Sequence, residues 1–539
     1  MSSSYEPRPV PVNSTGPVRV TPANVRDDGR RCPHRLADKT RPAAPRPRRP
    51  GAGRALLDST LRALDDVLDL VEFRERSLDE ALAEWRASPA RRVHPGLDQW
   101  TEHAVRGYLA ASAALPGGTL LEPMSRTWAR QRAPRAPGDP DVYEEIVTGR
   151  RYAGHRVREL RLVRTGSVRD RPRDEAEIAV AVGVLAGGRP VLGPKWGPKP
   201  LTLGAFEPAR GIRLVEIGCL DASHQVLFEG TSDQAYARYD AGVEARVRKV
   251  ITGGSYRPGE DCGRCPTVAD CPAVPSRPGL LGISNSGQPR RSWSMTTGRS
   301  YQACPARAHL EDLFLPRAEP AEGSQAVERG RAVHAWIESR HSRAPQRPCS
   351  PDDVPRAPDD PCEVSAAAGL EARLTTQMIG DHALVCPVRE HPDAELQPER
   401  AVAAYDPDAD VVVIAKTDLL YRVAEQWTLR ETKTTRVLSE GDPLERYPQL
   451  ALAVVLADAG VLPGDTPCRV ELERLTSSGP VLTEVEATAP DQVTRARQIL
   501  EGYVHAWHAD SRYPASPGKV CESCPYTRWC PDTAEGSSR

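Results

Sequence analysis

The feature that most constrains the fold of this 539-residue chain is a cysteine pattern that occurs twice. Each occurrence has a cysteine followed by proline and then, 230 or 217 residues later, a triplet with the spacing C-x2-C-x5-C. The first set is Cys32, Cys262, Cys265 and Cys271, and the second set is Cys304, Cys521, Cys524 and Cys530. Because a distant cysteine accompanies each local triplet, each set is expected to tie together the two ends of one folded unit.

Three kinds of site compete for these cysteines. Disulfides form in oxidising compartments, and the polar, proline-rich N-terminus has no apolar segment of the kind that directs export. Structural zinc sites usually combine two close cysteine pairs, whereas here one ligand of each set lies far upstream. A [4Fe–4S] cluster accepts four thiolates in this layout. The spacing therefore favours two iron–sulfur clusters, with zinc as the alternative in each set.

The other five cysteines show no regular spacing. They are Cys219, Cys349, Cys362, Cys386 and Cys468. Free cysteine is among the most buried residue types, so small buried side chains are expected at these positions.

The cysteine sets belong to a longer repeat. Apolar segments 177–188 and 449–460 are both expected to be helices, and 211–230 and 468–487 are both expected to be pairs of strands. A charged helix and a short loop then lead into each triplet. The matching order indicates tandem duplication of a unit of about 250 residues, with the expected fold class α/β.

The expected domain organisation follows from this repeat and from composition. Residues 1–15 and 533–539 are expected to be tails, 16–275 and 292–532 to be the two units, and 276–291 to be a linker rich in Pro, Gly and Ser. A second low-complexity stretch within the later unit, at 342–363, is expected to be a surface loop.

The net charge of −1 conceals a strong asymmetry. Residues 1–290 carry 45 Lys and Arg against 35 Asp and Glu, and residues 291–539 carry 27 against 38, so the two parts have net charges of +10 and −11. A basic half favours a polyanionic partner such as DNA. The sequence shows no apolar run long enough to span a membrane, and the protein is expected to be cytoplasmic.

The segment 410–433 carries the residues best suited to chemistry. Asp418 follows an apolar β-branched run, and Glu431 and Lys433 are two positions apart in the next expected strand, so their side chains share a face. Carboxylates are the oxygen ligands that Mg²⁺ and Mn²⁺ prefer. A lysine beside them can orient a water and offset phosphate charge. This trio is typical of metal-assisted phosphodiester hydrolysis, although a solvated amphipathic strand can show the same pattern.

Taken together, the motifs resemble the PD-(D/E)XK nucleases of the RecB type, and more closely the iron–sulfur branch that includes the AddB nuclease domain and CRISPR-associated exonucleases. The resemblance covers nearly all of 292–532. In order, the motifs are Cys304-Pro, a G-x-x-x-H ending at His334, Asp418, the E-T-K of Glu431 to Lys433, Gln449, and CESCPYTRWC. The G-x-x-x-H lies in an expected helix, 328–340, that is entered through Gly330. Two positions depart from the family pattern, because Lys416 replaces a glycine and Ala453 replaces a tyrosine.

The resemblance implies two tandem restriction-endonuclease-like units, each a central mixed β-sheet flanked by helices and closed by a four-cysteine cluster. It implies that His334, Asp418 and Glu431 hold Mg²⁺ or Mn²⁺. Lys433 would position the attacking water and Gln449 would support the site. The second cysteine set would bind a [4Fe–4S] cluster.

The first unit is expected to be a degenerate copy. In the repeat register Tyr152 occupies the Asp position, and the E-x-K position reads Glu159-Leu160-Arg161. Arginine does not replace a compact lysine ammonium freely, and a single carboxylate holds Mg²⁺ poorly. The first unit is therefore predicted to be a DNA-binding pseudo-nuclease.

The predicted function is a Mg²⁺- or Mn²⁺-dependent deoxyribonuclease of exonuclease type that acts on single-stranded DNA or duplex ends. The chain contains no phosphate-binding loop of the G-x-x-x-x-G-K-[ST] type, so a separate helicase, NTPase or defence-complex subunit is a possible partner. The alternative is a non-catalytic iron–sulfur scaffold that binds nucleic acid within a DNA repair or defence complex. A zinc-stapled structural protein is a third possibility.

Overall fold

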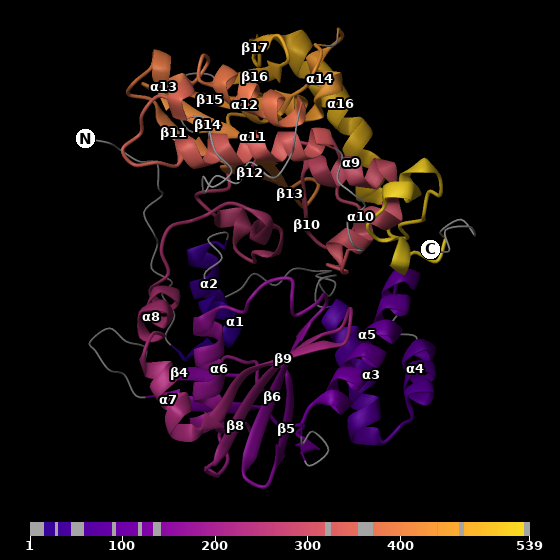
Figure 1. The fold of residues 1–539 in the computed structure, drawn as a ribbon. Helices are drawn as coiled ribbons and strands as arrows, with labels where there is room; N and C mark the ends of the chain where they lie inside the picture. The colour runs from indigo at the N-terminus through magenta and orange to yellow at the C-terminus, as the bar shows by residue number, and fades with distance from the viewer. Residues whose placement is uncertain are drawn as a thin grey trace.

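The computed structural model describes residues 16–26, 31–44, 59–88, 93–116, 121–132, 142–317, 325–353, 370–438, 440–462 and 468–532. Figure 1 shows the N-terminal half, coloured indigo to magenta, below the C-terminal half, coloured orange to yellow. Each half contains one small sheet and one five-stranded sheet. None of the helices in the described ranges is long and apolar enough to cross a membrane.

The five-stranded sheets of the two halves have the same arrangement. In the N-terminal half the order is β2 (Glu122–Pro123), β5 (Arg150–Gly154), β6 (Val157–Arg164), β8 (Gly211–Gly218) and β9 (Ser223–Thr231). In the C-terminal half it is β11 (Glu395–Pro398), β14 (Leu419–Val423), β15 (Gln426–Thr434), β16 (Arg469–Thr476) and β17 (Gly479–Val485). In both sheets only the third and fourth strands are parallel, and the other neighbours are antiparallel.

The small sheets also correspond. One consists of β1 (Val18–Val20), β4 (Tyr143–Ile146), β3 (Trp128–Arg132) and β7 (Arg189–Pro190), and the other of β10 (Arg291–Trp293), β13 (Val411–Lys416) and β12 (Ala401–Asp406). Each begins with a parallel pair and continues with an antiparallel neighbour. These mixed sheets with flanking helices confirm the predicted α/β fold class.

A buried helix connects the parallel strands in each half. Helix α6 (Glu175–Gly187) lies between β6 and β8 in the chain, and α15 (Pro448–Asp458) lies between β15 and β16. Parallel neighbours need a crossover of this kind, and both helices are apolar on nearly all sides because they are buried. They confirm the helices predicted over 177–188 and 449–460.

The segments that follow the β8–β9 and β16–β17 hairpins differ between the halves. In the C-terminal half one helix, α16 (Pro490–Ala509), continues for 20 residues. In the N-terminal half the expected single helix is divided into α7 (Ser232–Asp240) and α8 (Glu244–Thr252). Gly242 lies in the break, where glycine's low helix propensity favours interruption. The single helix predicted there is therefore wrong.

The remaining helices precede or flank the sheets. In the N-terminal half they are α1 (Pro22–Val25), α2 (Pro33–Lys39), α3 (Ser59–Arg74), α4 (Leu78–Ala87) and α5 (Pro95–Ala114). In the C-terminal half they are α9 (Met295–Ala303), α10 (Pro305–Asp312), α11 (Gln325–His341), α12 (Leu370–His382), α13 (Pro387–Glu390) and α14 (Pro443–Arg446).

Each cysteine triplet packs against the opposite half. Cys262 shares a core with Val412 and Ile414 of β13, and Gly263 approaches β10 so closely that an added Cβ would lie 2.7 Å from the backbone nitrogen of Ser292. Conversely, Trp529 of the second triplet packs in the core formed by α3, α4 and α5, which Figure 1 shows where the yellow C-terminal segment meets α5.

The segment predicted to be a linker, 276–291, is packed along the C-terminal half. Leu280 and Leu281 are buried in the main core of that half, and the Arg277 side chain donates hydrogen bonds to the carbonyl oxygens of Ala459 and Gly460. The two halves are therefore joined through an ordered connection. Of the predicted surface loop 342–363, residues 354–363 lie outside the described residues, as do the predicted tails 1–15 and 533–539.

Candidate active site and metal centres

Three elements of the C-terminal half bring the predicted catalytic residues together. Asp418 immediately precedes β14, and Glu431 and Lys433 project from one face of β15. His334 approaches from α11, with its Nδ1 3.3 Å from Oδ1 of Asp418. Asp418 is held by the backbone N–H of Thr432, which donates a 2.7 Å hydrogen bond to its Oδ2. The ammonium group of Lys433 forms an ion pair with Glu431.

Helix α11 reaches this position through a glycine inside the helix. It begins at Gln325, so Gly330 lies in its second turn and not at its start, which corrects the predicted helix boundary. A Cβ atom added at Gly330 would lie 3.3 Å from Oγ1 of Thr434 on β15. The absence of a side chain at Gly330 thus permits the helix to lie close to the strand, four residues before His334.

The electrostatics of the site reflect crowded charges in a half-buried place. Burial and the nearby Asp418 carboxylate raise the pKa of Glu431 to about 7, against the opposing effect of Lys433. Burial also acts to raise the pKa of Asp418, but the contact with His334 and the charge of Lys433 outweigh it and lower that pKa. Two carboxylates held this close together are the arrangement in which a divalent cation binds favourably.

For the two basic groups, burial acts to lower the pKa and the neighbouring carboxylates act to raise it. Burial acts to lower the pKa of His334, but Asp418 raises it above its usual value. Burial likewise acts to lower the pKa of Lys433, and the Glu431 and Asp418 carboxylates outweigh it so that the pKa is raised. Lys433 therefore stays charged, as a group that offsets phosphate charge must.

The structure adds Glu399, which the sequence analysis did not consider. A ligand atom of Glu399 lies within 4.8 Å of ligand atoms of both His334 and Asp418. Glu399 lies between β11 and β12, in a left-handed backbone conformation with φ of 53°, and its backbone N–H donates to the carbonyl oxygen of Asp418 at 3.2 Å. Lys416, which replaces the family's glycine, forms an ion pair with Glu399. No local sequence pattern indicates this contact, because it depends on how β12 pairs with β13.

Two further polar residues bear on the candidate site. Gln449 is at the second position of α15, and its Oε1 is buried without a hydrogen-bond partner among the described residues. A buried amide oxygen of this kind is costly unless a ligand or water satisfies it. Arg299, exposed on α9, is close enough for its charge to oppose the raised pKa of Lys433. The role of Gln449 stays a prediction from the resemblance, and Arg299, which has no motif around it, was not predicted.

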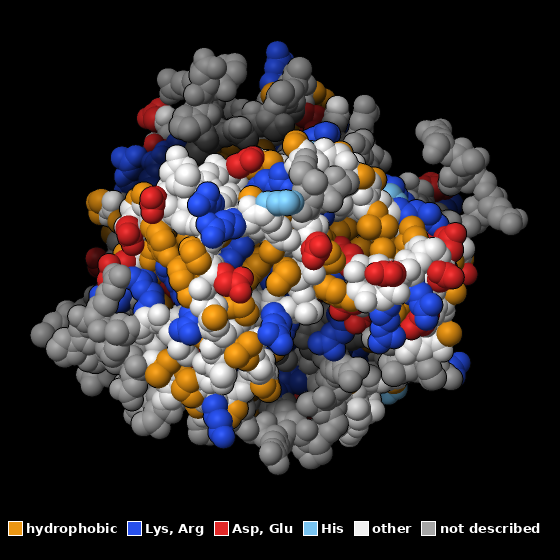
Figure 2. Space-filling view, turned by 90° about the horizontal axis from the view of Figure 1, so that it is seen from below, with side chains coloured by type: hydrophobic (Ala, Val, Ile, Leu, Met, Phe, Trp, Pro, Cys, Tyr) orange, Lys and Arg blue, Asp and Glu red, His pale blue; other side chains and the backbone are white. Residues whose placement is uncertain are grey.

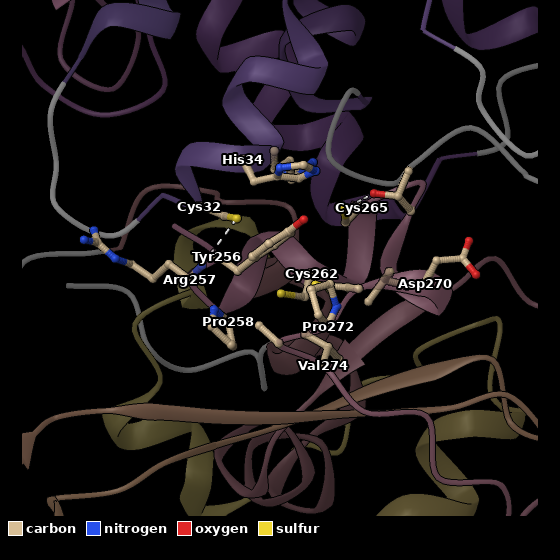
Figure 3. A pocket seen from close by; sticks show the side chains of 15 residues that line it. Cys32, His34, Tyr256, Arg257, Pro258, Cys262, Cys265, Asp270, Pro272 and Val274 are labelled. Carbon is tan, nitrogen blue, oxygen red and sulfur yellow. Dashed lines mark hydrogen bonds between the residues drawn. The ribbon is translucent and has the colours of Figure 1, made fainter. Parts of the chain in front are cut away.

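Each predicted cysteine set lines one pocket. The first set surrounds a cavity of about 70 Å³. Figure 3 shows this pocket with Cys32 at the start of α2, Cys262 and Cys265 from the triplet, and the rings of His34 and Tyr256. The centroids of these two rings are 4.4 Å apart. The second set lines a cavity of about 20 Å³.

Backbone amides point at the sulfur atoms in both pockets. In the first, Arg257 N–H donates to Cys32 Sγ at 3.5 Å and Gly259 N–H donates to Cys262 Sγ at 3.4 Å. In the second, Ser516 N–H donates to Cys304 Sγ at 3.4 Å. Burial raises the pKa of Cys262 to about 12. Amide hydrogen bonds to sulfur are a feature of iron–sulfur sites, and all four cysteines of each set line the same pocket.

In the N-terminal half, the β5–β6 hairpin places Gly149, Leu162 and Arg164 at the strand positions that Asp418, Glu431 and Lys433 have in the β14–β15 hairpin. The register predicted through Tyr152, Glu159 and Arg161 is therefore wrong, and these three residues belong to a different network. Tyr152 pairs with Glu159 across β5 and β6, and the Glu159 carboxylate is fully buried between the guanidinium groups of Arg161 and Arg213. The Arg161 guanidinium lies over the Tyr152 ring, 3.8 Å from its centroid. Both carboxylate oxygens of Glu159 are therefore engaged by arginine.

Residues 292–531 match the family model of the PD-(D/E)XK nuclease superfamily. No curated protein matches the chain. The match begins at β10 and ends after the second cysteine triplet, and it includes all the candidate catalytic residues of the C-terminal half.

Proposed function

We propose that the protein is a metal-dependent deoxyribonuclease whose catalytic site lies in the C-terminal half. The observation that carries the proposal is the convergence of His334, Asp418, Glu431 and Lys433 in one half-buried place, within the segment that matches a nuclease superfamily. Two carboxylates and an imidazole provide hard ligands for Mg²⁺ or Mn²⁺. Lys433 adds the positive charge that phosphodiester hydrolysis requires near the reacting phosphate.

His334, Asp418 and Glu431 would hold the divalent ion, and Glu399 is a further carboxylate within reach of the first two. When bound, the ion would polarise the phosphate and lower the pKa of a coordinated water. Thr432 fixes the Asp418 carboxylate through its backbone N–H. Lys433 would orient the attacking water, and Arg299 would contact a phosphate at the mouth of the site.

For the N-terminal half we propose a DNA-binding role without catalysis. Gly149 and Leu162 stand at the strand positions of Asp418 and Glu431, so this half lacks the carboxylate pair of the C-terminal site. The nearby Glu159 carboxylate is held by two arginines. Figure 2 shows the lower face of the molecule, where Lys and Arg side chains are spread among acidic and hydrophobic ones. With a net charge of +10 in residues 1–290, such a surface would bind DNA without sequence preference and with strong salt dependence.

We further propose that the two halves arose by tandem duplication and that they carry two [4Fe–4S] clusters in the RecB-like, AddB-type manner. The shared strand order and the shared position of the cysteine pockets support this. Anaerobic purification with iron and sulfide analysis tests the clusters. About eight iron atoms per chain are expected, whereas zinc in place of iron would contradict the proposal.

The catalytic proposal is tested by nuclease assays on single-stranded DNA, duplex DNA with free ends, circular DNA and RNA, with Mg²⁺ or Mn²⁺. Lys433→Ala and Glu431→Gln are expected to lower the rate by at least about 100-fold. Glu425→Gln, an exposed carboxylate in the turn of the same hairpin, is the matched control and should retain activity. Cleavage that survives Lys433→Ala would overturn the proposed site. Wild-type protein that binds DNA without cutting it would support the non-catalytic scaffold instead.

A further inference from the structure

We propose that His341, Cys349, His382 and Cys386 form a structural zinc site, separate from the candidate active site and from both cysteine sets. The nitrogen and sulfur atoms that these residues offer all lie within 4.8 Å of one another. The sequence analysis treated Cys349 and Cys386 as isolated buried side chains. They are buried, but each lies against two histidines that carry no recognisable motif.

The distances match tetrahedral coordination of one ion. The Nε2 atoms of His341 and His382 are 3.3 Å apart, and Nε2 of His341 is 3.5 Å from Cys349 Sγ and 3.6 Å from Cys386 Sγ. Zinc bonds of about 2.0 Å to nitrogen and about 2.3 Å to sulfur place tetrahedral ligands roughly 3.3–3.8 Å apart. The three distances from His341 Nε2 therefore fit one ion at the centre of the group, and the remaining pairs of ligand atoms lie within 4.8 Å.

The surroundings exclude water from the group. His382 and Cys386 have no exposed surface, and His341 and Cys349 are 2% and 4% exposed. Apolar side chains of α11 and α12, including Trp336 and Met378, form the core around them. Two imidazoles and two thiols that meet in a water-free place cannot satisfy all their polar atoms with hydrogen bonds, which costs free energy. An ion bound by all four side chains removes that free-energy cost.

A buried carboxylate orients one of the histidine ligands. Nδ1 of His382 is 2.7 Å from Oε1 of Glu473, which is fully buried on β16. Nδ1–H donates to this carboxylate, so Nε2 carries a lone pair directed into the group. Histidine ligands of zinc commonly have a carboxylate partner of this kind. His341 lacks such a partner among the described residues, which makes His382 the better oriented of the two.

The chemistry of the donors favours zinc. Two thiolates and two imidazoles in a tetrahedron are typical of Zn²⁺, and four protein ligands with no open position indicate a structural site. The same side chains would also permit a disulfide between Cys349 and Cys386, but both are free in this structure. A disulfide between these two cysteines is therefore the outcome that would contradict the zinc site in the experiments below.

The site would tie α11 to the segments that follow it. His341 ends α11, His382 ends α12, Cys386 precedes α13, and Cys349 lies in the chain between α11 and α12. His334 is seven residues before His341, on the same side of α11. A zinc ion at one end of the helix would thus hold the imidazole of His334 in place beside Asp418.

The test is metal analysis of the full-length protein, which does not depend on nuclease activity. Wild type is expected to contain about one zinc per chain in addition to iron. The double variant Cys349→Ala/Cys386→Ala is expected to lose that zinc and keep its iron, whereas the matched variant Cys219→Ala/Cys468→Ala, at two buried cysteines outside the group, is expected to keep both. Unchanged zinc in the first variant would overturn the proposal.

A second measurement covers the case in which the double variant does not fold. Wild-type protein reconstituted with Co²⁺ after chelation is expected to show the ligand-field and thiolate charge-transfer absorption of a tetrahedral site with two sulfur ligands. The conservative variant His382→Cys is expected to retain zinc, because a Cys₃His site is also tetrahedral. Wild type without zinc, in which Cys349 and Cys386 are joined by a disulfide in a mass-spectrometric digest, would overturn the proposal.

Discussion

The hydroxyl group of Thr432 donates a 3.0 Å hydrogen bond to Oε2 of Glu473, in the interior between β15 and β16. The backbone N–H of the same threonine donates to Asp418. Glu473 in turn orients His382. Thr432 therefore connects the candidate active site, through its main chain, to the proposed zinc site, through its side chain.

Replacing Thr432 by valine removes the hydroxyl but keeps the shape of the side chain and the backbone N–H. Glu473 is fully buried, so loss of one donor is expected to lower the free energy of unfolding by about 1–3 kcal/mol. Urea denaturation measures the change. Thr432→Ser, which retains the hydroxyl, should lose clearly less stability, and equal losses in the two variants would show that the hydrogen bond contributes little.

In the N-terminal half, Glu159→Gln leaves Arg161 and Arg213 buried without their shared carboxylate. Breaking a buried ion pair by removing one partner typically costs about 3–5 kcal/mol. We expect a loss of this size in denaturant unfolding, with nuclease activity unchanged at temperatures where the variant is folded. Glu229→Gln, an exposed carboxylate on β9, controls for the charge change. A neutral effect of Glu159→Gln would mean that the arginines find other partners.

The sequence was most informative where local patterns determine structure. The apolar segments became α6 and α15, and the segments 211–230 and 468–487 became the hairpins β8–β9 and β16–β17. The two-residue spacing of Glu431 and Lys433 placed both on one face of a strand, as predicted. Hydrophobic periodicity and strand alternation act over a few residues, so a single sequence displays them directly.

Features that depend on distant segments were missed. Glu399 reaches His334 and Asp418 only through the arrangement of β11, β12 and β14, and His341 meets Cys386 only because α11 packs on α12. The composition of 276–291 indicated a flexible linker, but Leu280 and Leu281 bury themselves in the neighbouring core. Burial of two leucines stabilises the ordered state by several kcal/mol, which outweighs the weak preference of Pro, Gly and Ser for disorder.

Arg299→Ala is expected to weaken binding of DNA without abolishing cleavage. Arg299 is exposed beside Lys433, so it would neutralise one phosphate. In the inactive Lys433→Ala background, the slope of log Kd against log salt concentration should fall by about 1, because one fewer counterion is released. Arg469→Ala, an exposed arginine at the start of β16, should leave the slope unchanged. An unchanged slope for Arg299→Ala would show that Arg299 does not contact a DNA phosphate.

The contact between the halves is expected to weaken in acid because of His309 on α10. Its ring stacks on Tyr513 with centroids 4.2 Å apart and lies 5.1 Å from the ring of His94, in the N-terminal half. Burial, aided by the charges of His94 and Arg291, lowers the pKa of His309 to about 3. Only the unfolded chain then takes up the proton below its ordinary pKa of 6.5, so stability falls as the pH falls from about 6.5 towards 3. At pH 5 the loss would be about 2 kcal/mol. His309→Phe, which keeps an aromatic ring against Tyr513, should reduce the difference in unfolding free energy between pH 7 and pH 5 by this amount, and an unchanged difference would assign the acid sensitivity to other groups.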